Sequence, residues 1–473
     1  MTQLYQPNNK SIQTTVGNIP LNIFRAYDIR GKSDTELTDE LSYLIGKAVA
    51  KELIAMGGNT VVIGRDCRVS SPGILNSTAQ GLIDSGNTVV DIGEVPTPVL
   101  YFAMHYLKCD AGIMVTGSHN PKEYNGLKLS LMGKPFYGSQ IIKLKDHIEK
   151  NDFVSAVGIY SKKNVVKEYM SKVLENIHHP TRKLKVVIDS GNGMAGEIAP
   201  RIAAALQHDV IEMFCQVDGN FPNHHPDPSK PSNLKELIDT VKKEKADIGL
   251  AFDGDADRLG VVDAYGRIVW PDRQLILFAK NILENRPGAS IVYDVKCTGS
   301  LPSTIRKLGG NPFICRTGHS FIKEMMITKK AELGGEMSGH IFFKDRWYGF
   351  DDAIYASARM LEMLSLAPDP RGFFDAVSSG YSTPEINIEL NEGEAQYLVD
   401  KVMLKKDSIK GQVITVDGLR IETTNSWGLM RASNTTPSLV LRFEGDSEKS
   451  LRQIQDIFRD LILSSESNIK LPF

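Results

Sequence analysis

Short apolar runs alternate with amphipathic stretches along most of this chain. Residues 61–64 and 88–92 form apolar runs of strand length, and apolar positions near Ile74 to Ile83 recur at helical spacing between them. Apolar residues from Leu41 to Leu53 have the same helical spacing. Apolar runs that end at turn residues are typical of buried strands, and their alternation with helices favours a largely parallel sheet. Ligand sites in such sheets lie outside the carboxyl ends of the strands.

The same alternation occurs twice more before the pattern changes near Pro384. Alternating apolar residues, two further strands and a closing helix then favour an α+β domain. We therefore predict an α/β protein of four domains, three similar α/β units with mixed, largely parallel sheets and a C-terminal α+β domain. The predicted strands are 185–189, 247–252, 291–295, 313–315, 413–415 and 439–443, the predicted helices follow Gly196 and cover 395–404 and 451–463, and the predicted domains are 1–163, 164–267, 268–380 and 381–473.

Length and composition limit the class of protein. The 473 residues are enough for three or four domains at about 150 residues each. With 41% hydrophobic residues, 24% charged residues and a net charge of -2, the chain has no overall field that would attract nucleic acid or a membrane. No signal peptide and no membrane-length apolar run are visible, and no C-x-x-C pair occurs among the five cysteines. We expect a cytoplasmic monomer with reduced cysteines, which are Cys67, Cys109, Cys215, Cys297 and Cys315.

One strand ends in a stretch that carries candidate chemistry. The apolar run Ala111 to Val115 stops at Thr-Gly-Ser-His-Asn-Pro, which predicts a tight loop after a buried strand. Ser118 is thus presented at a strand end beside His119, and Arg65 follows an earlier strand at the same predicted edge. Ser118 is either a covalent acceptor or a turn residue, because serine is common in turns for conformational reasons.

Three aspartates alternate directly after the strand 247–252. Asp253, Asp255 and Asp257 crowd like charges into one loop, which favours a hard cation such as Mg²⁺ or Ca²⁺. Arg258 stands where an EF-hand needs glycine. A solvated acidic turn is one alternative. A strand followed by Asp-x-Asp also resembles the haloacid-dehalogenase phosphatases, in which Asp253 would be the nucleophile, although Asp257 replaces their usual threonine or valine.

Three other stretches allow two interpretations each. Gly191 to Gly196 has the spacing of a dinucleotide fingerprint, with Glu212 as the ribose contact, but it also suits a glycine-rich turn. The loop Asp218 to Pro228 combines histidines, aspartates and prolines, and it is either a metal site or a rigid connection. Arg431 to Pro437 is either a phosphate cradle or an ordinary surface loop.

Five segments of the chain, in order, carry a resemblance to the α-D-phosphohexomutase family over nearly its whole length. They are Phe24–Gly31, the Ser118 loop, the three aspartates, Gly335–His340 and the Arg431 loop. Many relatives have glycine where this chain has Ala256, a methyl group that we expect to leave the carboxylates undisturbed. The resemblance implies four domains around a central cleft, named in order for phosphoserine, metal binding, sugar recognition and the phosphate clamp.

The resemblance also implies a reaction. A phosphoserine at Ser118 would move phosphate between O1 and O6 of mannose or glucose, with glucosamine phosphate as a further possible substrate. Mg²⁺ would be held by Ser118 and the three aspartates, and glucose or mannose 1,6-bisphosphate would be the activator. The alternative of another class is a non-catalytic sugar-phosphate sensor. The implied catalytic residues are Ser118, His119, Arg30, Lys128, His340 and Arg258, with His340 and Lys128 favoured for proton transfer, and the implied substrate contacts are Tyr27, Lys296, His319, Glu336, Ser338, His340, Arg431, Ser433, Asn434 and Thr435.

Overall fold

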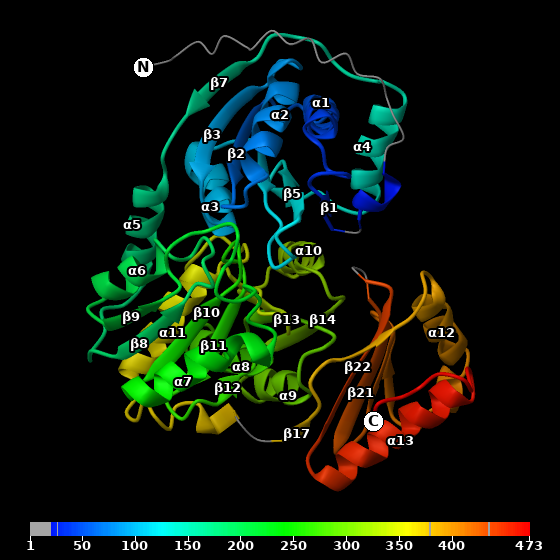
Figure 1. The fold of residues 1–473 in the computed structure, drawn as a ribbon. Helices are drawn as coiled ribbons and strands as arrows, with labels where there is room; N and C mark the ends of the chain where they lie inside the picture. Colours follow the sequence, from blue (N-terminus) through cyan, green and yellow to red (C-terminus); the bar gives the residue numbers. More distant parts are fainter. Residues whose placement is uncertain (1–19, 26, 378–379, 434–435) are drawn as a thin grey trace. The chain divides into compact units, whose positions relative to one another are not determined.

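The computed structural model describes residues 20–25, 27–377, 380–433 and 436–473 (Figure 1). The chain divides into two compact units. The first unit consists of Met1–Trp270 and Ser338–Phe373, and the second consists of Pro271–Met337 and Phe374–Phe473. Within the described ranges, no helix combines the length and the apolar character needed to cross a membrane.

The N-terminal part of the first unit is built on a seven-stranded mixed sheet. Strand β4 (Ala111–Val115) runs parallel to β2 (Thr60–Arg65), whereas β5 (Tyr124–Leu131) returns antiparallel to β4. The loop that carries Ser118 therefore joins two neighbouring antiparallel strands. The other strands are β1 (Ile29–Lys32), β3 (Thr88–Glu94), β6 (Lys134–Pro135) and β7 (Ile159–Lys162), and the order is β1-β5-β4-β2-β3-β7 with β6 beside β5.

Helices pack on this sheet through apolar side chains. Helix α1 (Asp39–Ala55) begins where the Thr38 side chain accepts the N–H of Leu41 at 3.2 Å, a helix cap that the acidic first turn reinforces. Its buried face, which includes Ile45 and Val49, joins the strands in one core. The other helices of this part are α2 (Ser71–Ile83), α3 (Thr97–Leu107), α4 (Ser139–Glu149) and α5 (Val166–Asn176).

A second sheet of the first unit presents the aspartates. Strand β10 (Ile248–Phe252) is fully buried and pairs in parallel with β8 (Lys185–Asp189) and antiparallel with β11 (Leu259–Asp263). The turn between β10 and β11 therefore holds all three aspartates at one end of the sheet. The order is β12-β11-β10-β8-β9, and the remaining elements of the first unit are β9 (Asp209–Met213), β12 (Ile268–Val269), β16 (Ile341–Phe343), α6 (Ala199–Ala205), α7 (Lys235–Glu244) and α11 (Ala353–Leu366).

The second unit contains two further sheets. In one, β13 (Ser290–Asp294) lies in parallel between β14 (Asn311–Cys315) and β15 (Leu333–Gly335). The other is antiparallel, in the order β17-β22-β21-β20-β19 with β18 also beside β22. Its strands are β17 (Tyr381–Ser382), β18 (Ile386–Glu389), β19 (Gln412–Ile414), β20 (Leu419–Glu422), β21 (Ser426–Ala432) and β22 (Ser438–Gly445), and the helices of this unit are α8 (Pro271–Asn285), α9 (Ser300–Lys307), α10 (His319–Lys329), α12 (Glu394–Met403) and α13 (Glu448–Leu463).

The predicted fold class is confirmed, with mixed α/β sheets followed by a C-terminal α+β domain. The range predicted as the third domain, 268–380, is shared between the two units. Helix α11 packs against α6 and β11 of the first unit, and nearly all of its side chains are buried. The four domain boundaries themselves remain predictions.

Candidate active site

Three buried aspartates occupy the turn between β10 and β11. Asp253, Asp255 and Asp257 are each 0% exposed, and one oxygen from each lies within 4.8 Å of the others. The turn is fixed because Asp253 Oδ1 accepts the N–H groups of Asp257 and Arg258, at 3.0 and 3.1 Å. Ala256 adopts a left-handed φ of 62°, which glycine adopts without steric cost and which explains the glycine of many relatives. The three carboxylates converge with alanine in place.

The electrostatics of this cluster favour a bound cation. Burial, followed by repulsion from Asp257 and Asp255, raises the pKa of Asp253 well above its usual value. Asp255 Oδ1 is buried and accepts no hydrogen bond from the described residues. Three carboxylates with only oxygen donors suit a hard cation such as Mg²⁺. The residues present therefore fit the metal that the family resemblance implies.

Lys128 partly neutralises the same cluster from β5. Its Nζ donates to Asp255 Oδ2 at 2.7 Å and also to Asp257 Oδ2, and its side chain is only 4% exposed. Burial opposes the ammonium form, but the two carboxylates outweigh it and raise the pKa of Lys128 well above its usual value. A lysine in this environment keeps its proton. The family resemblance favours Lys128 for proton transfer, and this role stays a prediction; the two ion pairs also place a fixed positive charge beside the aspartates.

The Ser118 hydroxyl points at the aspartates. Ser118 is 2% exposed and donates from Oγ to Asp253 Oδ2 at 3.0 Å, and its Oγ lies 3.1 Å from His119 Nδ1. Burial and the charge of Arg258 lower the pKa of His119 well below its usual value, so this histidine is neutral at pH 7. The serine that sequence placed at a strand end and the aspartates that it placed at another strand end thus form one buried group.

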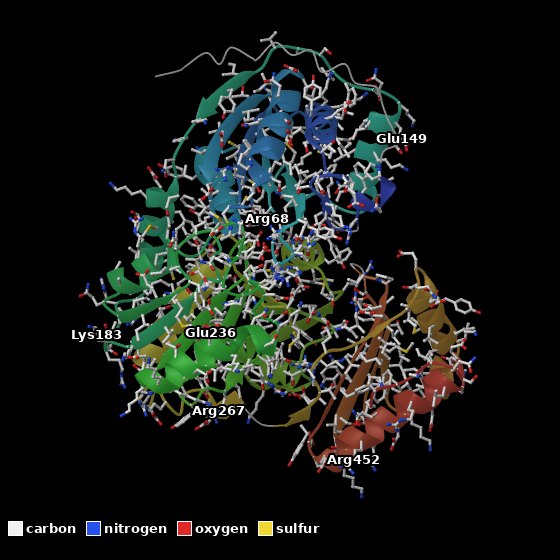
Figure 2. All side chains as sticks on the ribbon, viewed as in Figure 1. Arg68, Glu149, Lys183, Glu236, Arg267 and Arg452 are labelled. Atoms are coloured by element: carbon white, nitrogen blue, oxygen red, sulfur yellow. The ribbon has the colours of Figure 1, made fainter. Side chains whose placement is uncertain are left out.

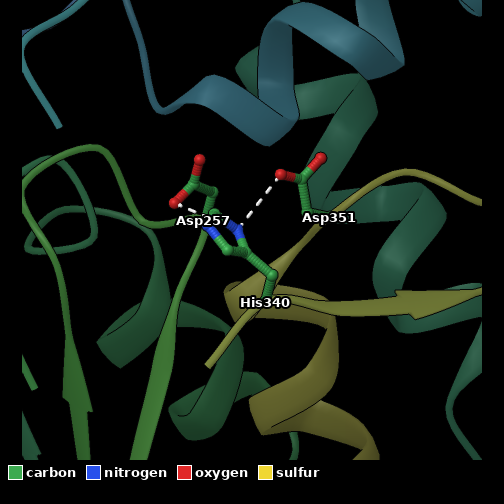
Figure 3. A group of neighbouring side chains, drawn as sticks. All are labelled: Asp257, His340 and Asp351. Atoms are coloured by element: carbon green, nitrogen blue, oxygen red, sulfur yellow. Dashed lines mark ion pairs between the residues drawn. The ribbon is translucent and has the colours of Figure 1, made fainter. Parts of the chain in front are cut away.

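His340 lies between two carboxylates, as Figure 3 shows. Its Nδ1 is 3.2 Å from Asp351 Oδ2 and 3.5 Å from Asp257 Oδ1, and its Nε2 accepts the Nε–H of Arg258 at 3.1 Å. These contacts assign the ring proton of neutral His340 to Nδ1, because Nε2 acts as acceptor. Sequence reasoning named His340 and Arg258 but missed Asp351, which is 0% exposed.

Three other predicted residues belong to the first unit. Arg30 donates to Asp28 Oδ2 at 2.5 Å and to Asn120 Oδ1 at 3.0 Å, so its guanidinium reaches the loop that carries Ser118. Tyr27 and Ser338 are half-buried. The structure therefore brings Arg30 to the serine loop.

The second unit carries the other predicted substrate contacts. Lys296 Nζ donates to Glu385 at 2.9 Å, and Arg431 Nε donates to Asp417 Oδ2 at 3.0 Å. Glu336 accepts the N–H of Gly318 at 2.6 Å, immediately before His319 begins α10. Ser433 Oγ accepts the hydroxyl of Thr436 at 3.0 Å, and the predicted contacts Asn434 and Thr435 lie outside the described residues.

Comparisons with known proteins identify the family of this chain. The four phosphoglucomutase/phosphomannomutase domains match in order, alpha/beta/alpha domain I at residues 21–155, domain II at 167–266, domain III at 270–372 and the C-terminal domain at 385–461. A phosphomannomutase/phosphoglucomutase of Pseudomonas aeruginosa is 48% identical over 96% of this chain and 98% of its own length. The chain belongs to the phosphoglucomutase/phosphomannomutase family.

Two further relatives support the assignment to this phosphohexomutase family. A phosphoglucomutase of Neisseria meningitidis is 46% identical over 96% of this chain and 99% of its own length. The crystal structure of a phosphoglucomutase/phosphomannomutase family protein from Burkholderia thailandensis superposes with a TM-score of 0.92, at 45% identity, and covers 96% of this chain and all of that one. The resemblance inferred from five motifs is confirmed.

Phosphohexomutase membership and the local structure together favour a glycine-rich turn over a dinucleotide fingerprint at Gly191 to Gly196. They also favour a rigid connection over a metal site in the loop 218–228. A Cβ on Gly193 would lie 2.9 Å from the Gly254 carbonyl oxygen, so this glycine allows the chain beside the aspartate turn to approach closely. In the loop 218–228, His224 Nε2 is 3.0 Å from Asp189 Oδ2, a contact that ties the loop to β8. Arg65, singled out from the sequence, pairs with Glu94 at 2.6 Å.

Proposed function

We propose that this chain is a phosphohexomutase that moves phosphate between O1 and O6 of mannose or glucose, with Ser118 as the phosphoryl carrier. The observation that carries the proposal is the buried contact of Ser118 Oγ with Asp253, at the mouth of a cluster of three carboxylates. The names of the relatives, which pair phosphomannomutase with phosphoglucomutase, support activity on both sugars. Glucose or mannose 1,6-bisphosphate would act as the activator.

The reaction is a pair of phosphoryl transfers in opposite directions. In the first, the P–O bond of phosphoserine 118 breaks and the phosphoryl group bonds to the free O1 or O6 hydroxyl oxygen. The sugar hydroxyl proton passes to a base, and Ser118 Oγ takes up a proton. The sugar 1,6-bisphosphate then turns around. Its other phosphoryl group returns to Ser118 Oγ, the serine proton leaves, and the departing sugar oxygen gains a proton, which restores the carrier and releases the isomeric monophosphate.

His340 is the proposed base of the first transfer. Its Nε2 carries the lone pair when Nδ1 faces Asp257 and Asp351, and these carboxylates stabilise the imidazolium that forms. Arg258, which donates to this nitrogen at 3.1 Å, would turn its donor toward the transferring phosphate. Lys128 and Arg30 supply fixed positive charge, the main requirement of phosphoryl transfer.

Asp253, Asp255 and Asp257 are the proposed protein ligands of one Mg²⁺, together with a phosphate oxygen on Ser118. When bound, the ion would offset the negative charge on the transferring group. Asp253 as a phosphatase nucleophile is not favoured, because one of its oxygens accepts two backbone N–H groups and the other accepts the Ser118 hydroxyl.

Residues of the second unit are proposed to hold the sugar and its second phosphate. Glu336 is proposed to offer a carboxylate to the sugar hydroxyls, and the family resemblance implies Ser338, Lys296 and His319 as further sugar contacts. Arg431 and Ser433 supply the donors of the phosphate clamp. Tyr27, Asn434 and Thr435 are proposed to join that clamp.

Phosphorus NMR tests the proposal on the purified protein with MgCl₂ and a trace of glucose 1,6-bisphosphate. We expect mannose 6-phosphate and glucose 6-phosphate each to be converted to the 1-phosphate, and Ser118→Ala to convert neither. Release of inorganic phosphate instead of the 1-phosphate would favour a phosphatase. Equal turnover by Ser118→Ala would refute the carrier role of the serine.

A further inference from the structure

Arg68 lies just beyond β2 and is outside the proposed catalytic set. Its side chain is 0% exposed, and Figure 2 labels its position in the first unit. We infer that Arg68 is a positioning residue, which holds the backbone of the phosphoryl-carrying loop in the shape that aims Ser118 Oγ at the aspartates. The inference rests on the proposed function of Ser118.

The Arg68 guanidinium donates hydrogen bonds to four carbonyl oxygens of this loop. Nη1 donates to Pro121 O at 2.6 Å and to Tyr124 O at 2.9 Å. Nη2 donates to Ser118 O and to Asn120 O, both at 2.7 Å. Arginine can do this because its planar fork presents five N–H donors in fixed directions, whereas lysine presents one compact ammonium. The fork therefore spans the loop from the serine to the start of β5.

Asp66 completes the support from the same segment. Its Oδ2 lies 3.2 Å from Arg68 Nε and accepts the N–H of Gly117 at 3.1 Å. Its Oδ1 accepts the N–H of Arg68 at 3.0 Å and the hydroxyl of Ser71 at 2.5 Å. The loop is thus held by its carbonyl groups through Arg68 and by an amide group through Asp66.

The loop needs this support because its geometry is unfavourable. Ser118 has a left-handed φ of 49°, a conformation that crowds the Cβ of a serine. The buried carbonyl group of Ser118 also needs a donor, and Arg68 Nη2 supplies it. Without the fork, the serine backbone would relax and its hydroxyl would leave the line toward Asp253.

Neighbouring residues leave the guanidinium little freedom. A Cβ on Gly117 would lie 2.5 Å from both Arg68 Cζ and Nε, so only glycine lets the loop pass this closely. The Phe221 ring lies 5.2 Å from Arg68 Cζ and covers the guanidinium from the loop 218–228. A residue of the second α/β domain, Phe221, thus packs against the arginine that holds the serine loop.

Arg68→Lys tests the inference with Arg359→Lys as its matched control. Arg359 is also buried in the first unit, stacks on an aromatic ring, Phe343, at 4.5 Å and pairs with the carboxylate of Asp345 at 3.0 Å. Dephosphorylated proteins are mixed with glucose 1,6-bisphosphate and MgCl₂. Intact mass then follows phosphate transfer to Ser118, and steady-state assays give kcat and KM.

We expect Arg68→Lys to lower the transfer rate and kcat by roughly 10- to 100-fold at nearly unchanged KM, because a misplacement of about 1 Å can cost that much. Arg359→Lys should keep the transfer rate, kcat and KM of the parent, even if its melting temperature falls. Rates for Arg68→Lys within twofold of the control would overturn the inference. A parent protein that takes no phosphate on Ser118 would overturn the proposed function instead.

Gly117→Ala tests the inference if Arg68→Lys does not fold, because its Cβ would lie 2.5 Å from Arg68 Cζ and Nε and 2.7 Å from Tyr124 O, which Arg68 holds. A folded Gly117→Ala protein with reduced transfer at unchanged KM supports the positioning role. A folded protein with the parent transfer rate overturns it.

Discussion

Removal of the Lys128 ammonium should destabilise the first unit in a way that Mg²⁺ reverses. Lys128→Met leaves Asp255 and Asp257 buried without the cation that contacts both of them. Loss of one partner of a buried ion pair typically costs about 3–5 kcal/mol, because the remaining charge is left uncompensated. At about 1.4 kcal/mol per power of ten, hydrogen-exchange protection should fall by roughly two to three and a half powers of ten.

The assay is hydrogen exchange of peptides from β5 and β10, which flank the carboxylates, with and without saturating MgCl₂. The bound cation should restore a large part of the lost protection in Lys128→Met, because it supplies the missing positive charge. Lys185→Met is the matched control. Lys185 is 34% exposed and pairs with Glu244 at 3.1 Å, so its loss should cost less than about 1 kcal/mol and should not depend on Mg²⁺.

Two results would refute this reasoning. Protection in Lys128→Met equal to that of the parent would mean that the two carboxylates do not need the ammonium. A loss of the same size with and without MgCl₂ would mean that the aspartates do not hold the ion.

Three other predictions concern the metal, the clamp and pH. Asp255→Asn should lose most turnover and weaken Mg²⁺ binding in calorimetry while the circular dichroism stays unchanged; full activity in excess chelator would contradict the metal site. Arg431→Ala should raise the KM for hexose 1-phosphate by roughly ten- to a hundredfold, the loss of about 1.5–3 kcal/mol from a charged hydrogen bond, and should make initial rates depend on added bisphosphate; parent values for both would exclude a clamp role. Burial opposes the charged form of His224, but Asp189 outweighs it and raises the pKa, so the pair stabilises the fold fully below about pH 6.5 and loses this contribution as pH rises through the folded pKa. Urea unfolding of His224→Gln should lack that decline, and an unchanged pH profile would contradict it.

The strand-end chemistry could be predicted from sequence because each candidate directly follows a buried apolar run. Ser118 comes shortly after β4 and Asp253 directly after β10. These strands belong to different sheets of the first unit, and Ser118 Oγ lies 3.0 Å from Asp253 Oδ2. The alternating Asp253, Asp255 and Asp257 also predicted a bound cation, because three like charges lie in one loop. The hydrophobic pattern therefore predicted the fold class and each strand-end candidate, whereas their assembly into one group was implied by the family resemblance.

Residues that act through tertiary contacts left no such signal. Asp351 meets His340 only after the chain has folded back, and its neighbour Asp352 shows the one local cue, a helix cap that accepts the N–H of Tyr355 at 2.8 Å. The sequence singled out Arg65 because it lies at a strand end, but the side chain that contacts the serine loop is that of Arg68. Hydrophobic periodicity carries no information on which of two nearby arginines reaches a loop 50 residues away.

The division of the third α/β domain was also beyond the sequence pattern. Residues 338–373 belong to the first unit, where α11 packs on α6 and β11. Nearly all of its side chains are buried, Arg359 and Glu362 among them. The apolar residues of such a helix predict burial but do not specify the partner.

Phosphosite mapping distinguishes directly between Ser118 and Asp253 as the residue that carries the phosphoryl group. The dephosphorylated protein is incubated with glucose 1,6-bisphosphate and MgCl₂, digested and mapped by mass spectrometry before and after hydroxylamine treatment. We expect one phosphate on Ser118 that resists hydroxylamine, as phosphoserine does, and none on Ser118→Ala. A phosphate on Asp253 that hydroxylamine removes would contradict the carrier role of Ser118, because the aspartate would then carry the phosphoryl group.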